Sequence, residues 1–250
     1  MTTSVAVIGA NGRMGSLACR LIEQSDDFRL AAGIGSSGDL SEMLEADLAI
    51  DFTVPEVSPA VVEYAVAHGV PILVGTSGWS AERVEELETT IGGKFSVGVI
   101  IVPNFSLGSV LATRLAVTAA RFFDSVEIIE AHHEHKIDSP SGTAVRTAEL
   151  ITEARGARGP VDAPFADQPA RGQQVAGVPV HSLRMHGVAA RQQVILGGAG
   201  EQLMIQHDTL SASAYEAGIM LALRALPKTR GVVVGLDRLL GLDDEGASPS

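Results

Sequence analysis

The 250-residue sequence is short of cysteine, of basic residues and of long apolar runs. Its single cysteine, Cys19, excludes an intrachain disulfide and fits a reducing compartment. Lys and Arg number 18 against 30 Asp and Glu, and the net charge of −12 argues against nucleic acid and anionic membranes as partners. No apolar run reaches the roughly 18 residues of a membrane-spanning helix, and no basic-then-apolar leader opens the chain. We therefore expect a cytoplasmic protein that binds neither nucleic acid nor membrane.

Apolar residues are plentiful, at 46% of the chain, and their spacing predicts a parallel sheet in the N-terminal part. Short apolar stretches alternate there with stretches of helical spacing, which indicates right-handed βαβ units. The predicted strands are 4–8, 28–34, 47–52, 70–74 and 95–102, and the predicted helices are 13–24, 58–68 and 81–91. Ligands of such sheets bind beyond the carboxyl ends of the strands, so the loops that follow these strands are expected to converge on one site.

The first of these loops, Gly9-Ala-Asn-Gly12-Arg-Met-Gly15, stands between a predicted strand and a predicted helix. That context makes a G-x-x-G-x-x-G string a candidate dinucleotide site. Gly9 would allow the tight turn, Gly12 would let the backbone approach the pyrophosphate, and Gly15 would let the helix pack on the strand. The candidate cofactor-binding residues are Gly9, Ala10, Asn11, Gly12, Arg13 and Met14, with Gly75, Thr76 and Ser77 after the fourth strand and Val102, Pro103, Asn104 and Phe105 after the fifth.

A row of five ionisable side chains, His132 to Lys136, lies between a predicted strand, 126–129, and a predicted helix, 143–154. If the strand conformation persists through the row, His132, Glu134 and Lys136 project to one side and the two other histidines to the opposite side. Cations beside a helix N-terminus suggest a small acid with one or more carboxylates, and histidine suggests proton transfer to it.

Other interpretations of this row remain open. A charge run is usually a solvated face, although three histidines and a lysine beside a Ser-Gly-Thr helix start favour function. A metal-dependent hydrolase or lyase using His132, His133 and His135 is the sharper competitor, with Glu134 as a ligand or base. The lack of other cysteines and of a His-Glu-x-x-His pattern, and the cation of Lys136, argue against a metal. A third possibility is a cofactor-sensing protein without chemistry.

The C-terminal half predicts a second set of elements. A long apolar helix, 107–123, leads into it, and 155–179 has the composition of a mobile surface loop. Ser213-Ala-Tyr-Glu216 has the pattern of a capping box that opens a helix to about residue 226. The remaining predicted strands are 180–184, 192–196 and 202–207, in a mainly antiparallel order that could pair between subunits, and 232–236, returning to the first sheet.

The glycine string, together with Glu130-Ala-His-His-Glu-His-Lys136-x-Asp-x-Pro-Ser-Gly-Thr-Ala144, resembles the bacterial dihydrodipicolinate reductase family. Its members are also called 4-hydroxy-tetrahydrodipicolinate reductases and serve diaminopimelate and lysine synthesis. The similarity covers nearly the whole chain, because it includes Asp51-Phe-Thr53, Gly75-Thr-Ser-Gly78, Pro103-Asn-Phe105, Phe122-Phe-Asp124 and Val234-Gly-Leu236.

The resemblance implies an α/β fold with a Rossmann-like parallel-sheet domain that binds the dinucleotide, residues 1–105 and 213–250. Residues 106–212 would form a smaller α+β domain with a mixed or mainly antiparallel sheet, which binds the substrate and builds a homotetramer. The implied reaction is hydride transfer from NAD(P)H to 4-hydroxy-tetrahydrodipicolinate, a small dicarboxylate, giving tetrahydrodipicolinate.

The resemblance also implies roles for single residues. His132 would be the proton donor and Lys136 the second catalytic group, with no metal. His133, Gly142 and Thr143 would hold the substrate carboxylates. The chain departs from the family pattern at Ser139, where Ala is common, and at Trp79, where Phe is common.

A further departure concerns the coenzyme. The carboxylate that binds the adenosine ribose is expected after the second strand, but Gly35, Ser36 and Ser37 stand there. Either Asp39 folds back onto the ribose diol, or Ser36 and Ser37 bind a 2′-phosphate with help from Arg13. We expect NADPH and NADH both to serve, with NADPH used at least as well.

Overall fold

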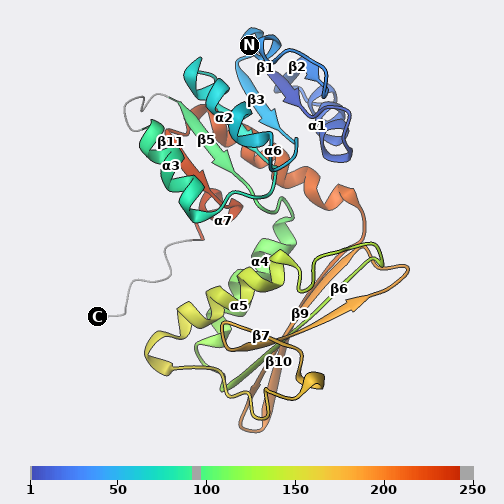
Figure 1. Cartoon of the computed structure of the whole chain (residues 1–250), viewed down its shortest axis with the longest axis vertical. Coiled ribbons are helices and arrows are strands. Elements are labelled where there is room, and N and C mark those ends of the chain that lie inside the picture. Colours follow the sequence, from blue (N-terminus) through green and yellow to red (C-terminus); the bar gives the residue numbers. More distant parts are fainter. Residues whose placement is uncertain (1, 92–96, 243–250) are drawn as a thin grey trace. The chain divides into compact units, whose positions relative to one another are not determined.

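The structure is a computed structural model that describes residues 2–91 and 97–242. The chain forms two compact units (Figure 1). The first combines residues up to Phe105 with those from Tyr215 onward, and the second is Ser106–Ala214. The boundary expected at residue 213 lies within the short 3₁₀ turn Ala212–Tyr215, where the chain passes from one unit to the other.

The first unit is built on a six-stranded parallel sheet, ordered β11-β5-β4-β3-β1-β2. From β2 the chain crosses to the opposite side of β1, so the strand order reverses at β1, the usual ligand-binding point of such sheets. Every strand predicted for this unit is present, and residues 95 and 96 of the predicted fifth strand lie outside the described residues. The strands are β1 Thr3–Ile8, β2 Phe28–Ile34, β3 Leu48–Asp51, β4 Ile72–Val74, β5 Gly98–Ile101 and β11 Gly231–Val234.

The central strands of this sheet are apolar at most of their buried positions because helices pack against them; the exceptions are Ser4 in β1 and Asp51 at the end of β3. These helices are α1 Arg13–Glu23, α2 Ser58–Ala67, α3 Ala81–Ile91, α6 Glu216–Ala225 and α7 Leu236–Leu239. The capping box predicted at Ser213 is wrong. Helix α6 begins at Glu216 after Tyr215, which makes no side-chain cap, and the Ser213 hydroxyl lies 2.6 Å from that of Ser211. The intervening 3₁₀ turn takes Ser213 out of the capping position.

The second unit is built on a five-stranded mixed sheet, ordered β10-β9-β6-β8-β7. The central strand β6 pairs antiparallel with β9 and parallel with β8. Two helices, α4 Leu107–Ala120 and α5 Gly142–Arg155, bury their alanine-rich faces on one side of this sheet. The strands are β6 Ser125–His132, β7 Gln173–Val175, β8 Val178–Arg184, β9 Ala190–Gly198 and β10 Glu201–Thr209.

The segment predicted as a mobile loop, 155–179, is ordered at both ends, so that prediction is wrong there. Arg155 ends α5 with its side chain buried, donating hydrogen bonds to four backbone carbonyls. At the other end, β7 pairs with β8 through a hairpin whose turn residues, Ala176 and Gly177, both have positive φ. A non-glycine residue at one of these positions hid the hairpin from sequence analysis.

Candidate active site

The glycine loop after β1 is shaped by three close backbone approaches. Gly9 has φ +81°, and its N–H donates to the Ile34 carbonyl at 2.8 Å. A Cβ on Gly9 would lie 2.4 Å from the Phe52 carbonyl oxygen, and one on Gly15 would lie 2.1 Å from the Gly9 carbonyl oxygen. Helix α1 starts after Gly12 with no side-chain cap and no acidic residue in its first turn. Its N-terminal N–H groups therefore suit a pyrophosphate, which is the fit expected of a dinucleotide cradle.

The loops after β3, β4 and β5 meet beside this cradle, within the same unit. The rings of Phe52 and Phe105 lie 5.6 Å apart between centroids. A Cβ on Gly75 would come within 2.1 Å of the Phe52 ring and 2.7 Å of the Phe105 ring, so only glycine fits between them. The three loops thus converge, as predicted, at Phe52, Gly75 and Phe105, of which Gly75 and Phe105 are candidate cofactor residues.

A buried carboxylate that the sequence analysis had given no role holds two of these loops in place. Asp51, at the end of β3, is 0% exposed and accepts hydrogen bonds from the Thr53 N–H at 2.9 Å and hydroxyl at 2.6 Å. The Ser58 hydroxyl also donates to it, and the Trp79 Nε1–H donates to Ser58 at 3.0 Å. Asp51 therefore links the loop after β3 to the loop after β4.

Asp39, the alternative ribose ligand, is engaged as a helix cap. Its carboxylate accepts the Ser41 N–H at 2.9 Å, and its own N–H donates to Glu42 at 3.3 Å, so it starts the 3₁₀ helix Leu40–Glu45. The hydrogen bond from the Ser41 backbone lowers the pKa of this exposed carboxyl. Ser36 and Ser37 are exposed, as is Arg13.

The row of ionisable residues in the second unit follows a different path from the extended one considered above. Strand β6 ends at His132, and the Lys136 N–H donates to the His133 carbonyl at 3.1 Å, closing a turn. The expected alternation of sides is therefore wrong beyond His132. His133 and His135 are exposed, whereas His132 is partly buried on the helix-covered face of the sheet.

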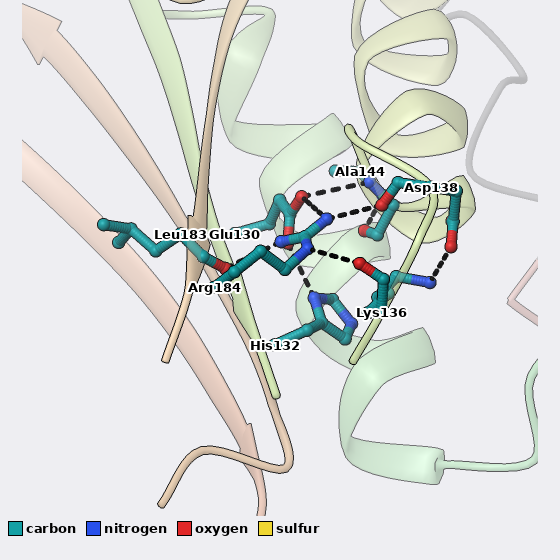
Figure 2. A network of polar contacts seen from close by, with 8 residues as sticks. Glu130, His132, Lys136, Asp138, Ala144, Leu183 and Arg184 are labelled. Carbon is teal, nitrogen blue, oxygen red and sulfur yellow. Dashed lines mark hydrogen bonds and ion pairs between the residues drawn. The ribbon is translucent and has the colours of Figure 1, made fainter. Parts of the chain in front are cut away.

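Glu130 is the hub of the site (Figure 2). Its carboxylate is 0% exposed and accepts His132 Nδ1–H at 2.6 Å, both terminal nitrogens of Arg184 at 2.9 Å each, and the Ser141 N–H at 3.1 Å. Burial raises the pKa of Glu130, but hydrogen bonds from Arg184, Ser182 and His132 outweigh burial, so the net pKa is lowered. Glu130 therefore remains a carboxylate inside the unit.

Glu130 also decides how His132 carries its proton. An ionised carboxylate on Nδ1 requires a hydrogen there, so the neutral ring leaves Nε2 bare. Among the described residues Nε2 has no hydrogen-bond partner. Burial lowers the pKa of His132 and outweighs Glu130, which raises it, while Lys136 and Arg184 lower it further. The ring can therefore take up and release a proton through Nε2 alone.

The other expected site residues surround this dyad. Lys136 Nζ lies 2.7 Å from Asp138 Oδ1, with the lysine side chain 21% exposed. Ser141 caps α5 by accepting the Ala144 N–H at 3.2 Å. Gly142 and Thr143 then occupy the first turn, where backbone N–H groups have no intrahelical acceptor. A Cβ on Gly142 would meet nothing within 4 Å, so this helix start is open.

The histidines do not gather into a metal site among the described residues, which contain no group of three or more His, Cys, Asp or Glu placed to hold a metal ion. The rings of His133 and His135 are 6.4 Å apart, and Glu134 Oε1 lies 2.8 Å from His186 Nδ1 and 3.4 Å from His135 Nε2. In the described part of the chain, no helix combines the length and apolar character needed to cross a membrane.

Comparison with known proteins accounts for the presence of both sites in one chain. The family model for the dihydrodipicolinate reductase N-terminus matches residues 3–105, and that for its C-terminus matches residues 108–240. The chain belongs to the dihydrodipicolinate reductase family. The resemblance inferred from the two motifs is confirmed.

Named relatives are similar to this sequence over almost its full length. The 4-hydroxy-tetrahydrodipicolinate reductase of Clavibacter sepedonicus is 66% identical over 243 residues, covering 97% of this chain and 88% of that protein. That of Streptomyces griseus is 43% identical over 245 residues, covering 96% and 98%. The structure of a dipicolinate-bound dihydrodipicolinate reductase from Paenisporosarcina sp. TG-14 matches with a TM-score of 0.82 and 26% identity, covering 95% and 99%. The expected fold class is likewise confirmed.

Two members of the network escaped sequence analysis as functional residues. In the sequence, Glu130 is only the first residue of the motif that ends at Ala144, and Arg184 only the last residue of the predicted strand 180–184. Arg184 contacts Glu130 across 54 positions of sequence, through the parallel pairing of β6 with β8. The one available signal was Glu130 itself, because a carboxylate in an apolar strand needs a cationic partner.

Proposed function

We propose that the chain carries out the reaction of its family, with His132 as the proton donor. Family membership makes it an NAD(P)H-dependent reductase of 4-hydroxy-tetrahydrodipicolinate in diaminopimelate and lysine synthesis. The observation that carries the assignment of the site is the Glu130–His132 pair, which leaves one titratable nitrogen beside the open start of α5. A reduced nicotinamide supplies the hydride when bound.

The side chains supply the proton. Loss of the 4-hydroxyl group as water gives a conjugated carbon–nitrogen system, and hydride addition to that system leaves electron density that must be protonated. His132 delivers that proton from Nε2 while Nδ1 stays hydrogen-bonded to Glu130. A dianionic substrate nearby raises the pKa of His132, because an opposite charge favours the protonated ring. Binding of the substrate thus charges the donor. Lys136, held by Asp138, adds a second positive group at the reacting end.

The substrate carboxylates have matching partners at the helix start. The N–H groups of Gly142 and Thr143 and the positive end of the α5 dipole favour an anion. His133 is exposed and one residue beyond the donor, so it adds a further donor to the same carboxylates. The dipicolinate in the related Paenisporosarcina structure supports a small dicarboxylate as the ligand of this fold.

The coenzyme is held by the first unit, with the pyrophosphate on residues 9–14 and the nicotinamide side on the loops 75–77 and 102–105. We propose that NADPH and NADH both serve and that NADPH is used at least as well. Asp39 supports this proposal because its carboxylate already caps a 3₁₀ helix. Exposed Ser36, Ser37 and Arg13 then offer donors and charge to a 2′-phosphate.

We further propose a cytoplasmic homotetramer assembled through the second sheet. The face of that sheet opposite α4 and α5 carries apolar side chains that are partly exposed, including Leu183 at 44% and Met204 at 49%. Such a face is suited to pairing with another copy. Light scattering of the purified chain would measure the assembly directly.

The reaction is tested by following nicotinamide absorbance with substrate generated enzymatically in the cuvette. Oxidation of NADPH and NADH should require both the substrate and the chain, and exhaustive chelation should leave the rate unchanged. Steady turnover would exclude a protein that only senses the cofactor. A stoichiometric zinc ion whose removal abolishes the rate and whose return restores it would support the metal-dependent alternative instead.

A further inference from the structure

Arg184, at the end of β8, uses all of its donors inside one small volume. A guanidinium has five N–H groups, and here each has an acceptor (Figure 2). Nη1 donates to Glu130 Oε2 at 2.9 Å and to the Leu183 carbonyl at 2.7 Å. Nη2 donates to Glu130 Oε1 at 2.9 Å and to the Asp138 carbonyl at 2.6 Å, while Nε donates to the Lys136 carbonyl at 3.3 Å. The side chain is 20% exposed.

Apart from the neighbouring Leu183 carbonyl, these acceptors belong to two different parts of the catalytic machinery. The Glu130 carboxylate orients the His132 ring through Nδ1. The carbonyls of Lys136 and Asp138 belong to the turn that carries the Lys136 ammonium and its carboxylate partner. One planar group therefore spans both, as Figure 2 shows, with the carboxylate on one side and the turn on the other.

We propose that Arg184 is a positioning residue that fixes His132 and Lys136 relative to each other, through Glu130 on one side and the backbone of the 136–138 turn on the other. This inference rests on the proposed roles of His132 and Lys136. Arg184 itself acts only through these neighbours.

The fixed, planar arrangement of the donors of the Arg184 guanidinium explains why an arginine is needed. Glu130 is fully buried, and a buried carboxylate without a partner is strongly destabilising. A lysine would neutralise it with a compact ammonium, but its three donors cannot match the directions of two carboxylate oxygens and three carbonyls. Charge alone therefore satisfies Glu130 but leaves the 136–138 turn unheld.

Few charges act on His132, so their effects can be separated. Burial has the largest effect and lowers the pKa of His132; Glu130 on the same strand raises this pKa, and Lys136 and Arg184 lower it. The facing residues of β9, Ala190 and Gln192, are neutral. Because the protonated ring is the donor, activity falls as the pH rises through this pKa. Removing Glu130 should therefore move the alkaline limb of the pH profile to lower pH, and removing the charge of Arg184 should move it to higher pH.

The test compares kcat/KM against pH for the parent, Glu130→Gln, Arg184→Gln and Arg184→Lys. We expect the alkaline limb to shift by about one pH unit, to lower pH in Glu130→Gln and to higher pH in Arg184→Gln. This is the size of pKa shift that a nearby charge produces. Arg184→Lys should keep the parent limb but lose kcat by about tenfold to 10²-fold, as expected for a misplaced donor. Arg146→Gln and Glu149→Gln, which break an exposed ion pair on α5, are the matched charge controls and should leave the profile unchanged.

Nitrogen NMR of the His132 ring provides a readout that needs no turnover. The neutral ring should carry its proton on Nδ1 in the parent and in Arg184→Lys, and on Nε2 in Glu130→Gln. If Arg184→Gln unfolds because Glu130 is left unpaired, the double variant Glu130→Gln/Arg184→Gln removes both charges and should fold.

The outcomes separate the inference from the reaction. The inference would be overturned if the parent turned over substrate and the kcat/KM of every variant fell by the same factor at all pH values. Arg184 would then have only a structural role. Parent-like kcat in Arg184→Lys would overturn it as well. Absence of turnover in the parent, with the predicted ring tautomers intact, would instead contradict the proposed function.

Discussion

The glycine loop after β1 and the charged network after β6 both lie where a strand leads into a helix, yet they are built from different groups. The first consists of backbone, and side chains are excluded from it by approaches such as the 2.1 Å from a Gly15 Cβ to the Gly9 carbonyl. The second consists of side chains, centred on a carboxylate with 0% exposure. The first site should therefore be sensitive to added atoms and the second to lost ones.

The largest expected effect comes from removing atoms at the second site. His132→Ala and Lys136→Ala should each lower kcat by roughly 10²–10⁴-fold, the range for loss of a general acid. His133→Ala should act mainly on KM, because it removes binding rather than proton transfer. Steady-state kinetics with both coenzymes measure this, and exposed His135→Ala is the control. Retention of most of the kcat by His132→Ala would show that another group donates the proton.

Adding one methyl group separates the two helix starts. Gly15→Ala forces the helix away from Gly9, which should cost about 1–3 kcal/mol of stability, as overpacking does, and raise the KM for the coenzyme. Gly142→Ala adds the same methyl at the start of α5 into open space, so the melting temperature should stay within a few degrees of the parent. Thermal unfolding and coenzyme KM measure the contrast. Equal destabilisation by both substitutions would mean that the two helix starts do not differ in this way.

The smallest effect is on coenzyme choice, where a charge is added to the backbone-built site. Gly35→Asp should shift preference towards NADH by about 1–2 kcal/mol, the scale of a charge-assisted hydrogen bond. The new Cβ would lie 2.5 Å from Asn11 Nδ2, the end of a flexible side chain that can move aside. Gly35→Asn is the control, since it has the same shape without the charge.

The measurement is the ratio of kcat/KM for the two coenzymes. A parent that prefers NADH by more than about tenfold, roughly 1.4 kcal/mol, would show that another group binds the ribose diol. Asp39→Asn would then identify or exclude the remaining carboxylate of that loop.

The difference between a site made of backbone and one made of side chains also explains what could be predicted from the sequence. Glycines at fixed spacing and apolar alternation are local, so the parallel sheet and its loops were found, with β2 and α3 matching their predicted bounds. The β7–β8 hairpin was missed because Ala176 takes a conformation that propensity assigns to glycine or asparagine.

The side-chain site was only half predictable for the same reason. The histidines and Lys136 stand together in the sequence, but the turn after His132 and the Arg184 fork depend on pairing between distant strands. The Ser213 prediction failed because a 3₁₀ turn displaced the helix start by a few residues. Local sequence patterns identify residues that belong to a site, and the pairing of distant strands determines the orientation of their side chains.

The discontinuity of the first unit has a consequence for the order in which the chain folds during synthesis. Strand β11 pairs with β5 only after the whole of Ser106–Ala214 has been made, and α6 reaches back to the N-terminal residues through Arg20–Glu216 and Asp27–Arg224. The second unit is continuous and can close on itself while β5 still presents an unpaired, apolar edge on the ribosome. An interrupted message that ends before residue 231 would release a chain with a finished second unit and that edge exposed, a template for aggregation.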